Sequence, residues 1–325
     1  MSGLRIGSLC TGYGGLDMAA QAVFGGELAW VADIDAGASR ILAHHHPEVS
    51  NLGDITALDW RDVGPVDVLT GGYPCQPFSL AGRRKGTADE RHIWPYIAHA
   101  LGVLRPRYAV LENVANHLRL GFADVLADLA RLGFDAEWCV VRADQVGAPH
   151  QRRRLFVLAT AADAPHLGYQ RGGGTRGRGV GSADGRCAAA HAERVLSGDH
   201  GELPAGRDAV RPGVRNDAPR CGTPAAARPP DADWGRFAPA VARWERVTGH
   251  RAPWAVDHRG RLSPAFVEWL MGLDPGHVTA VPGLSRNAQL KALGNGVVPQ
   301  QAAHALSVLH GRLADRPERT FAHAA

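Results

Sequence analysis

The first 160 residues alternate short apolar runs with segments whose apolar positions recur every three or four residues. Strands are predicted for the apolar runs LRIGSLC, ELAWVADID, VDVLT, YAVLENV, AEWCVV and RRLFVLAT, and a helix is predicted for LDMAAQAVF. Helical spacing also predicts helices over residues 93–104, before Pro106, and residues 122–132, before Gly133. This alternation is typical of βαβ units, so we expect an α/β domain built around a parallel sheet.

The pattern changes between residues 163 and 257. The stretch RGGGTRGRGVGSADGR is rich in glycine and arginine, prolines multiply, and neither the strand nor the helix period persists. Helical spacing returns in SPAFVEWLMGL and VVPQQAAHALSVLHGRL. We therefore expect residues 1–162 and 258–325 to form one α/β domain, interrupted by a smaller, irregular and partly flexible domain at residues 163–257.

Composition excludes several classes of protein. No apolar run reaches the roughly 18 residues that cross a bilayer, and the N-terminus lacks the layout of a signal peptide, so a cytoplasmic monomer is expected. The five cysteines lie far apart without metal-ligand spacing, so neither disulfides nor a metal site is expected. The three histidines HHH at residues 44–46 are interpreted as a solvated helix end, not a metal site. A net charge of +4 suits a polyanionic partner without requiring one.

A glycine-rich turn follows the first predicted strand. In SLCTGYGGLDMAA, Gly12, Gly14 and Gly15 separate this strand from a helix, and the missing side chains let a ligand approach the helix N-terminus. Asp33 and Asp35 end the next strand about twenty residues later, where a carboxylate can accept hydrogen bonds from a ribose. The GxGG spacing lacks the GxGxxG of dinucleotide sites, which favours an adenosine without phosphates, as in S-adenosylmethionine, over NAD.

A third acidic residue follows another short segment at the expected sheet edge. Asp54, in GDIT, could bind the amino group of an adenine. For each of the three aspartates the alternative is a turn or helix-cap residue. Three acids at successive strand ends favour the ligand site.

The stretch GGYPCQPFS places Cys75 between two prolines. Pro74 and Pro77 fix their own φ, and Gly71 and Gly72 allow a sharp exit from the preceding strand, so Cys75 is expected on a stiff loop. This stretch alone leaves two alternatives open, a small buried core cysteine and a reactive thiol.

With GGYPCQPFS, LENV and GAPHQRRRLFVL in this order, the chain resembles the DNA (cytosine-5) methyltransferases. The likeness runs from SLCTGYGGLD through GDIT to residue 160 and resumes with RLSPAFVEWLMGL and LKALGNGVVPQ. The unmatched middle is where this family carries its target recognition domain. The resemblance implies a Rossmann-like methyltransferase that uses S-adenosylmethionine and acts on double-stranded DNA.

The resemblance also implies two groups of site residues. Those expected to line the S-adenosylmethionine pocket are Cys10, Gly12, Gly14, Gly15, Asp33, Ile34, Asp54, Ile55 and Asn295. Those expected around the target cytosine are Cys75, Glu112, Arg152 and Arg154. The chain departs from the family pattern at Cys10, usually phenylalanine, at Ile34, often tryptophan, and at His150, which replaces the glutamine of a QxRxR motif.

The family's reaction explains these residue types. Carbon 5 of cytosine is a weak nucleophile, so a thiolate, here Cys75, first adds to carbon 6 of a base flipped out of the duplex. Glu112 can hydrogen-bond the ring nitrogen and the amino group, while Arg152 and Arg154 offset negative charge and hold the loop.

Several alternatives stay open at this point. Glu112 and Asn113 could cap a turn, and residues 152–154 could be a solvated charge run. The same chemistry could act on RNA. Rivals from other classes are a cysteine hydrolase or acyltransferase, which would need a histidine base, and a DNA-binding protein without catalytic activity.

Overall fold

The computed structural model describes residues 3–74, 93–162 and 234–315. The chain divides into two units, Met1–Leu167 with Ala225–Ala325, and Gly168–Pro224. The second unit lies outside the described residues, so the described fold is that of the first unit.

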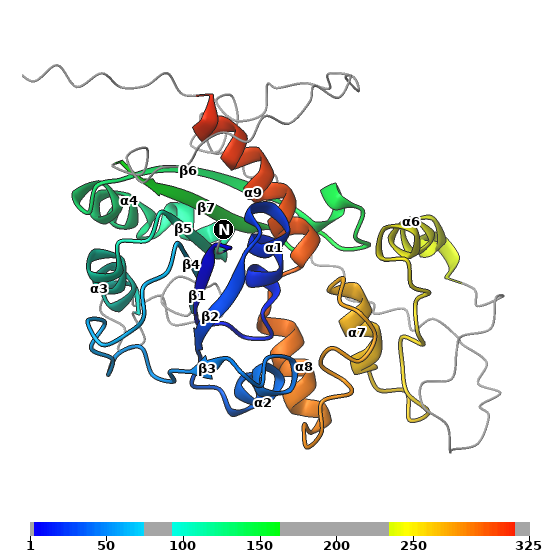
Figure 1. Cartoon of the computed structure of the whole chain (residues 1–325). Coiled ribbons are helices and arrows are strands. Elements are labelled where there is room, and N and C mark those ends of the chain that lie inside the picture. Colours follow the sequence, from blue (N-terminus) through cyan, green and yellow to red (C-terminus); the bar gives the residue numbers. More distant parts are fainter. Residues whose placement is uncertain (1–2, 75–92, 163–233, 316–325) are drawn as a thin grey trace, which may run out of the picture. The chain divides into compact units, whose positions relative to one another are not determined.

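A seven-stranded sheet of order β3-β2-β1-β4-β5-β7-β6 forms the centre of the described fold (Figure 1). The strands predicted from apolar runs are confirmed. The bounds are β1 (Arg5–Leu9), β2 (Glu27–Ala32), β3 (Ser50–Asn51), β4 (Val68–Gly72), β5 (Tyr108–Val114), β6 (Phe134–Val141) and β7 (Arg154–Ala161).

The expectation of a parallel sheet is wrong for one strand. The strands from β3 to β5 pair in parallel, but β7 runs antiparallel to both β5 and β6. A parallel return needs a crossover of a dozen or more residues, usually a helix. Between β6 and β7 the chain forms only the short 3-10 helix η3 (Ala143–Val146) and a loop. It therefore comes back antiparallel.

Helices cover both faces of the sheet because successive strand residues point to opposite faces. Leu69 and Leu111 belong to the apolar cluster that includes side chains of α3 (Trp94–Leu104) and α4 (Phe122–Arg131). Val68 and Val110 belong to the cluster on the other face, with α1 (Gly15–Phe24) and α9 (Pro299–Ala314). Figure 1 shows α3 and α4 away from α1 and α9. The helices predicted for these segments are confirmed.

A third apolar cluster lies around helices from the later part of the chain. These are α6 (Ala238–Thr248), which follows η5 (Gly235–Phe237), α7 (Pro264–Leu270) and α8 (Arg286–Asn295). Trp244 of α6 is fully buried, and its indole Nε1 donates to the Trp269 carbonyl at 2.8 Å. In the described residues, α2 (Ala36–His45) follows β2, and the 3-10 helix η2 (Ala115–Arg119) follows β5. The sequence pattern did not predict α8, because RNAQLKALGN has no continuous apolar stripe.

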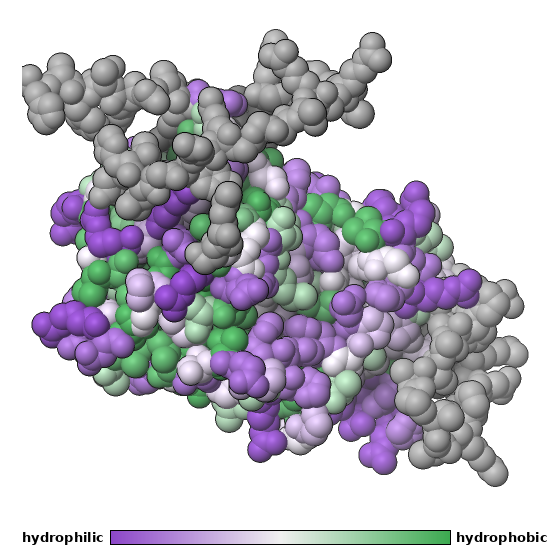
Figure 2. Space-filling model, in the orientation of Figure 1, coloured by the Kyte–Doolittle hydropathy of each residue, from purple (hydrophilic) through white to green (hydrophobic). Residues whose placement is uncertain are grey.

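Within the described ranges, no helix is both long enough and apolar enough to cross a bilayer. Figure 2 shows hydrophilic and hydrophobic residues interspersed over the face that it presents. Such mixing is normal for a folded domain.

Candidate active site

A cavity of about 630 Å³ lies at the carboxyl ends of β1, β2, β4 and β5. The chain leaves β1 in one direction for β2 and returns to β4 on its other side, and such switch points are where α/β sheets bind ligands. The predicted residues that line the cavity are Cys10, Gly12, Gly15, Asp33, Ile34, Asp54, Ile55, Glu112, Arg154 and Asn295. Gly14 and Arg152 are not part of its lining, and Cys75 lies outside the described residues.

The glycine turn is fixed by backbone geometry. Gly12 and Gly14 have φ values of 60° and 86°, which favour glycine, and Gly14 is the N-cap of α1. Gly15 is required for a different reason, because a Cβ there would overlap the carbonyl oxygen of Val297. The Gly12 amide donates to Asp33 Oδ2 at 2.8 Å, which ties the turn to the end of β2. Gly14 therefore shapes the turn without facing the cavity.

Asp33 is half-buried at the cavity wall. Its Oδ2 accepts from Gly12, and its Oδ1 accepts from the Asp35 amide at 2.8 Å. Burial raises the pKa of Asp33, although both hydrogen bonds oppose the shift. A carboxylate has about four lone-pair sites, so Asp33 can still accept hydrogen bonds from a ribose.

The other two aspartates have local structural partners. Asp35 is the N-cap of α2, accepting from the amides of Gly37 and Ala38, and it also pairs with Lys291. Hydrogen bonding by Lys291 lowers the pKa of Asp35. Asp54 is exposed, and its Oδ1 accepts from the amide and hydroxyl of Thr56 at 2.9 and 2.8 Å. Asp35 thus has the cap role and Asp54 has a turn role, and both also line the cavity.

Apolar residues on the cavity wall differ in their exposure. Ile34 is 75% exposed, which leaves its side chain free to cover a flat ring. Cys10 is more enclosed, and burial raises the pKa of its thiol to about 12. Cys10 is therefore a neutral, small apolar wall residue at physiological pH.

The side of the cavity formed by β5 and β7 contains a buried ion pair. Glu112 lies two residues before the end of β5 with 7% of its surface exposed, and Arg154 Nε lies 2.9 Å from its Oε1. Burial raises the pKa of Glu112, and the charges of Arg154 and Arg152 act in the opposite direction. The neighbouring strand contributes Gly72, directly opposite Glu112 in register, which keeps the space beside the carboxylate open.

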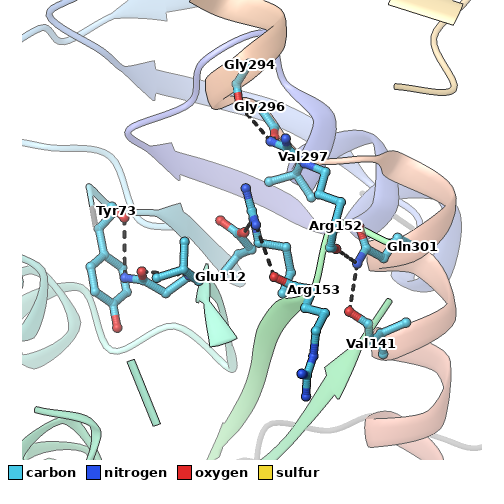
Figure 3. Close-up of polar contacts among 12 residues, drawn as sticks. Tyr73, Glu112, Val141, Arg152, Arg153, Gly294, Gly296, Val297 and Gln301 are labelled. Carbon is cyan, nitrogen blue, oxygen red and sulfur yellow. Dashed lines mark hydrogen bonds and ion pairs between the residues drawn. The ribbon is translucent and has the colours of Figure 1, made fainter. Parts of the chain in front are cut away.

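Arg152 faces the turn after α8 and not the cavity. Its guanidinium donates to the carbonyls of Gly294 and Gly296 at 2.8 and 2.5 Å (Figure 3). Its backbone has a φ of 28°, which side-chain-bearing residues rarely adopt, and its carbonyl accepts from Gln301 Nε2 at 2.8 Å. His150, at the departure from the family motif, lies with Nε2 2.9 Å from the Leu270 carbonyl. Arg152 and His150 therefore bind backbone carbonyls of segments that come later in the chain.

Tyr13 holds the same turn from the opposite side, a role that the sequence did not suggest. Its buried hydroxyl donates to the Val297 carbonyl at 2.6 Å. A Cβ at Gly296 would overlap the Tyr13 ring, so the close approach requires glycine there. The Tyr13 carbonyl accepts from His277 Nε2 at 2.9 Å. The turn at residues 294–297, which lines the cavity, is fixed by these contacts.

The histidines at residues 44–46 do not form a metal site with other described residues. The ring of His45 stacks on that of His277 with centroids 4.1 Å apart, and its Nε2 donates to the His277 carbonyl. No group of three or more histidine, cysteine or acidic side chains suited to a metal occurs in the described ranges.

Asp17 is a cavity residue to which the sequence pattern assigned no role. It is 1% exposed, its Oδ2 accepts from Ser8 Oγ at 2.9 Å, and its Oδ1 accepts from Thr70 Oγ1. Burial raises its pKa to about 6. The only available signal was an acid in the first helical turn after a glycine turn, and this position is also typical of an ordinary helix N-terminus.

Tyr73 and Asn113 complete the wall beside Glu112. The Tyr73 hydroxyl lies 2.8 Å from His117 Nε2, and the Tyr73 carbonyl accepts from Asn113 Nδ2 at 3.4 Å. Asn113 Oδ1 accepts from the Val114 amide within β5, and the N-terminus of the 3-10 helix that follows, η2 (Ala115–Arg119), has no side-chain cap, so neither Glu112 nor Asn113 caps it. Glu112 is instead paired with an arginine and faces the cavity.

The sequence model of the C-5 cytosine-specific DNA methylases matches residues 4–171, which is about half of the chain. The protein belongs to this family. The matched region includes the glycine turn, the ends of β2, β4 and β5, and the arginines at the start of β7.

Several methyltransferases are similar to about half of the chain. The type II methyltransferase M.NgoBV of Neisseria gonorrhoeae is 29% identical over 156 residues, covering 44% of this chain and 37% of that protein. M.NaeI of Lentzea aerocolonigenes is 32% identical over 166 residues, covering 49% and 40%. The chain thus matches less than half of the length of these relatives.

Solved structures share the fold over nearly the whole chain. The S. pombe Dnmt2 methyltransferase has a TM-score of 0.58 and 16% identity, covering 95% of this chain and 99% of that one. The Entamoeba histolytica methyltransferase EhMeth has a TM-score of 0.59 and 14% identity, covering 96% and 99%. The α/β fold is therefore that of a Rossmann-like methyltransferase.

Proposed function

We propose that the protein transfers a methyl group from S-adenosylmethionine to carbon 5 of a flipped-out cytosine in a specific sequence of double-stranded DNA, through a covalent intermediate on Cys75. The observation that carries this proposal is the buried pair of Glu112 and Arg154, which shares one cavity with the glycine turn and Asp33. The acid, the arginine and the residues proposed to bind the nucleoside therefore line the same cavity.

The cavity residues fit the proposed cofactor. Asp33 and Asp54 offer carboxylate oxygens to a ribose and an adenine amino group, and Ile34 offers an apolar face to the adenine ring. Asn295 adds an amide to the cavity wall. Asp17, which lines the cavity, can provide negative charge, and this suits a ligand with a sulfonium and an ammonium group. The bound cofactor would supply an electrophilic methyl group.

Glu112 would stabilise the activated base. Its raised pKa makes the carboxyl group readier to hold a proton, so it can donate to the ring nitrogen on which charge builds up as sulfur adds to carbon 6. Arg154 fixes the orientation of this carboxyl group through its 2.9 Å contact. Because the carboxyl group is already held in place, it does not have to reorient during the reaction.

Cys75 would provide the nucleophile. Pro74, the residue before it, lines the cavity, as does Ile93 beyond the segment that is not described. The thiolate forms a bond to carbon 6, carbon 5 then takes the methyl group, the carbon-5 proton is lost, and the carbon–sulfur bond breaks to restore the ring. The proposed form is a cytoplasmic monomer without a metal.

Residues 163–257 are proposed to select the target sequence. They interrupt the two parts of the catalytic domain and contain fourteen arginines and no lysine. Arginine suits bidentate contacts with guanine edges as well as phosphates.

The decisive test is sequencing of methylated cytosines in DNA from cells that express the protein. We expect one methylated sequence with wild-type protein and none with Cys75→Ser, whose hydroxyl is far less acidic than a thiol. In parallel, a duplex with 5-fluorocytosine at that site should trap an adduct on Cys75, because fluorine cannot leave as a proton does. Methylation of transfer RNA but not duplex DNA, or an adduct on another residue, would contradict the proposal.

A further inference from the structure

Tyr73 is the first residue after β4 and precedes Cys75 by two residues in the sequence. It is only 5% exposed, although its side chain carries a hydroxyl group. The residue before it, Gly72, is directly opposite Glu112 in the register of β4 and β5. Figure 3 shows Tyr73 and Glu112 at these neighbouring strand ends. Along the chain, Tyr73 therefore stands between the position that faces Glu112 and the proposed nucleophile.

The Tyr73 hydroxyl donates to a buried histidine. His117 belongs to η2 and is 1% exposed, and its Nδ1 lies 2.8 Å from the Leu120 carbonyl. A carbonyl can only accept, so Nδ1 carries the hydrogen of the neutral ring and Nε2 is an acceptor. Burial raises the pKa of Tyr73, so its hydroxyl keeps its proton at physiological pH. The hydroxyl therefore donates a hydrogen bond to His117 Nε2, over a distance of 2.8 Å.

Aromatic rings pack around both side chains. The Tyr73 ring meets the His117 ring edge to face with centroids 5.6 Å apart, and it lies 5.7 Å from the Trp94 ring. The His117 ring meets the Phe122 ring edge to face at 5.7 Å. Trp94, the first residue of α3, is held in turn, because its Nε1 donates to Asp128 Oδ2 at 2.7 Å. Tyr73 thus connects the end of β4 with α3 and with the segment that follows β5.

Packing alone does not require the hydroxyl group of Tyr73. Phenylalanine would fill the same space, and a buried hydroxyl is unfavourable unless it is hydrogen-bonded. Buried polar networks instead select one arrangement of the segments that they connect. The backbone of Tyr73 is held as well, since its carbonyl accepts from Asn113 Nδ2 at 3.4 Å. The point from which the chain continues to Cys75 is therefore fixed by both the side chain and the backbone of Tyr73.

We propose that Tyr73 and His117 are positioning residues, whose hydrogen bond sets the place of Cys75 relative to Glu112. His117 is not part of the cavity lining, so it acts through Tyr73. The bond joins the segment that leads to Cys75 with the segment that follows Glu112, and these two groups act on the same base. An attacking atom that is misplaced by about 1 Å can lower a rate about 10²-fold. The inference rests on the proposed function, because it needs Cys75 as the nucleophile.

The test compares Tyr73→Phe, His117→Asn and His117→Gln in the full chain. Tyr73→Phe removes the donor and keeps the ring. Asparagine can still donate to the Leu120 carbonyl from the position of Nδ1, but it is too short to accept from Tyr73, whereas glutamine can bring an amide oxygen to the position of Nε2. The rate of adduct formation with a duplex containing 5-fluorocytosine measures the attack by Cys75. Single-turnover methyl transfer, the KM for DNA and S-adenosylmethionine affinity by calorimetry are measured beside it, below the unfolding temperature of each variant.

Tyr73→Phe and His117→Asn should each slow adduct formation and methyl transfer about 10- to 100-fold, with the KM for DNA and the cofactor affinity unchanged. His117→Gln should be faster than His117→Asn, because it restores the acceptor. The double variant Tyr73→Phe/His117→Asn should be no slower than either single variant, because both changes remove the same hydrogen bond. Tyr96→Phe, at an exposed position of α3, is the matched control and should react at the wild-type rate.

A purely structural role gives a different result. It would lower the unfolding temperature of Tyr73→Phe and leave its rate of adduct formation at the wild-type value, which would overturn the proposal. Multiplicative losses in the double variant, or a His117→Gln protein as slow as His117→Asn, would also overturn it. Should His117→Asn fail to fold, Tyr73→Phe decides the question alone, since it keeps the packing of the ring.

Failure of this proposal and failure of the proposed function are distinguishable. If the wild-type protein forms an adduct on Cys75 and Tyr73→Phe forms it equally fast, the positioning role is wrong and the proposed function stands. If Tyr73→Phe loses cofactor affinity together with rate, Tyr73 acts on the cofactor pocket, and the positioning role is again wrong. If the wild-type protein forms no adduct on Cys75 and methylates no DNA, the proposed function itself fails.

Discussion

The cavity has a buried floor and an open rim, and acids in the two regions behave in opposite ways. On the floor, Asp17 and Glu112 are 1% and 7% exposed, and burial raises the pKa of both. On the rim, hydrogen bonds lower the pKa of Asp35 and Asp54. The pKa of a carboxyl group is therefore controlled by desolvation on the floor and by nearby hydrogen-bond donors at the rim.

This difference determines where substitutions should have large effects. Water does not screen a charge on the floor, so removing its partner strongly destabilises the folded protein. An exposed ion pair, in contrast, contributes only about 0–1 kcal/mol to stability. Substitutions can test the contrast directly.

The largest effect is expected for Glu112→Gln. The change keeps the shape of the side chain but removes the proton donor and the charge that Arg154 contacts. Single-turnover methyl transfer should slow about 10²- to 10⁴-fold, while S-adenosylmethionine binding persists. The exposed acid Glu48 supplies the control, because Glu48→Gln should transfer methyl groups at the wild-type rate. Normal turnover by Glu112→Gln would remove Glu112 from the proposed chemistry.

Asp17→Asn should stabilise the protein near neutral pH. The folded-state pKa of about 6 exceeds the ordinary value of 3.8, so the folded protein binds more protons between these values and its stability falls as pH rises from about 4 to 6. Two pH units correspond to about 3 kcal/mol. The hydroxyls of Ser8 and Thr70 can rotate to accept from an amide.

Urea unfolding at several pH values measures this prediction. The free energy of unfolding of Asp17→Asn should exceed that of wild type at pH 7.5, and the two should converge near pH 4. A variant that is less stable at every pH would mean that the ionised carboxylate on the floor stabilises the fold.

Tyr13→Phe, a change at a buried residue that holds the turn at residues 294–297, should have a smaller effect. It leaves the Val297 carbonyl without its buried donor, so the free energy of unfolding should fall by about 1–3 kcal/mol. Because the turn at residues 294–297 lines the cavity, S-adenosylmethionine affinity should also fall, as measured by calorimetry. The exposed Tyr96 gives a matched control, since Tyr96→Phe should change neither quantity. Unchanged cofactor affinity in a destabilised Tyr13→Phe protein would limit Tyr13 to a role in folding.

The smallest effect is expected at the rim. Lys291 pairs with Asp35, but the two side chains are 62% and 35% exposed. Lys291→Gln should change the free energy of unfolding by less than about 1 kcal/mol, and the change should vanish in high salt. A larger, salt-independent loss in thermal or urea unfolding would show that the rim pair is as well shielded as the floor.

The sequence by itself determined most of the helices and strands and most of the predicted positions on the cavity wall. Apolar runs located the main strands, because β1, β4, β5 and β7 each bury side chains on both faces of the sheet. Gly12 and Asp33 were predictable because both follow directly from strand ends, and the carboxyl ends of parallel strands share one edge. Asp17 was missed because burial cannot be read from one acid at a helix start.

Only the tertiary structure decided which side chains meet on the floor. Because β7 runs antiparallel, its first residue, Arg154, lies at the same sheet edge as Glu112 near the end of β5. A parallel β7 would place this arginine at the opposite edge. Likewise, Tyr13 meets Val297 and Arg152 meets Gly294 only because the late chain returns to the early sheet. The direction of a strand, and the place where a late segment packs against the early sheet, depend on which arrangement of the whole chain buries the most apolar surface. The local periodicity of the sequence does not contain that information.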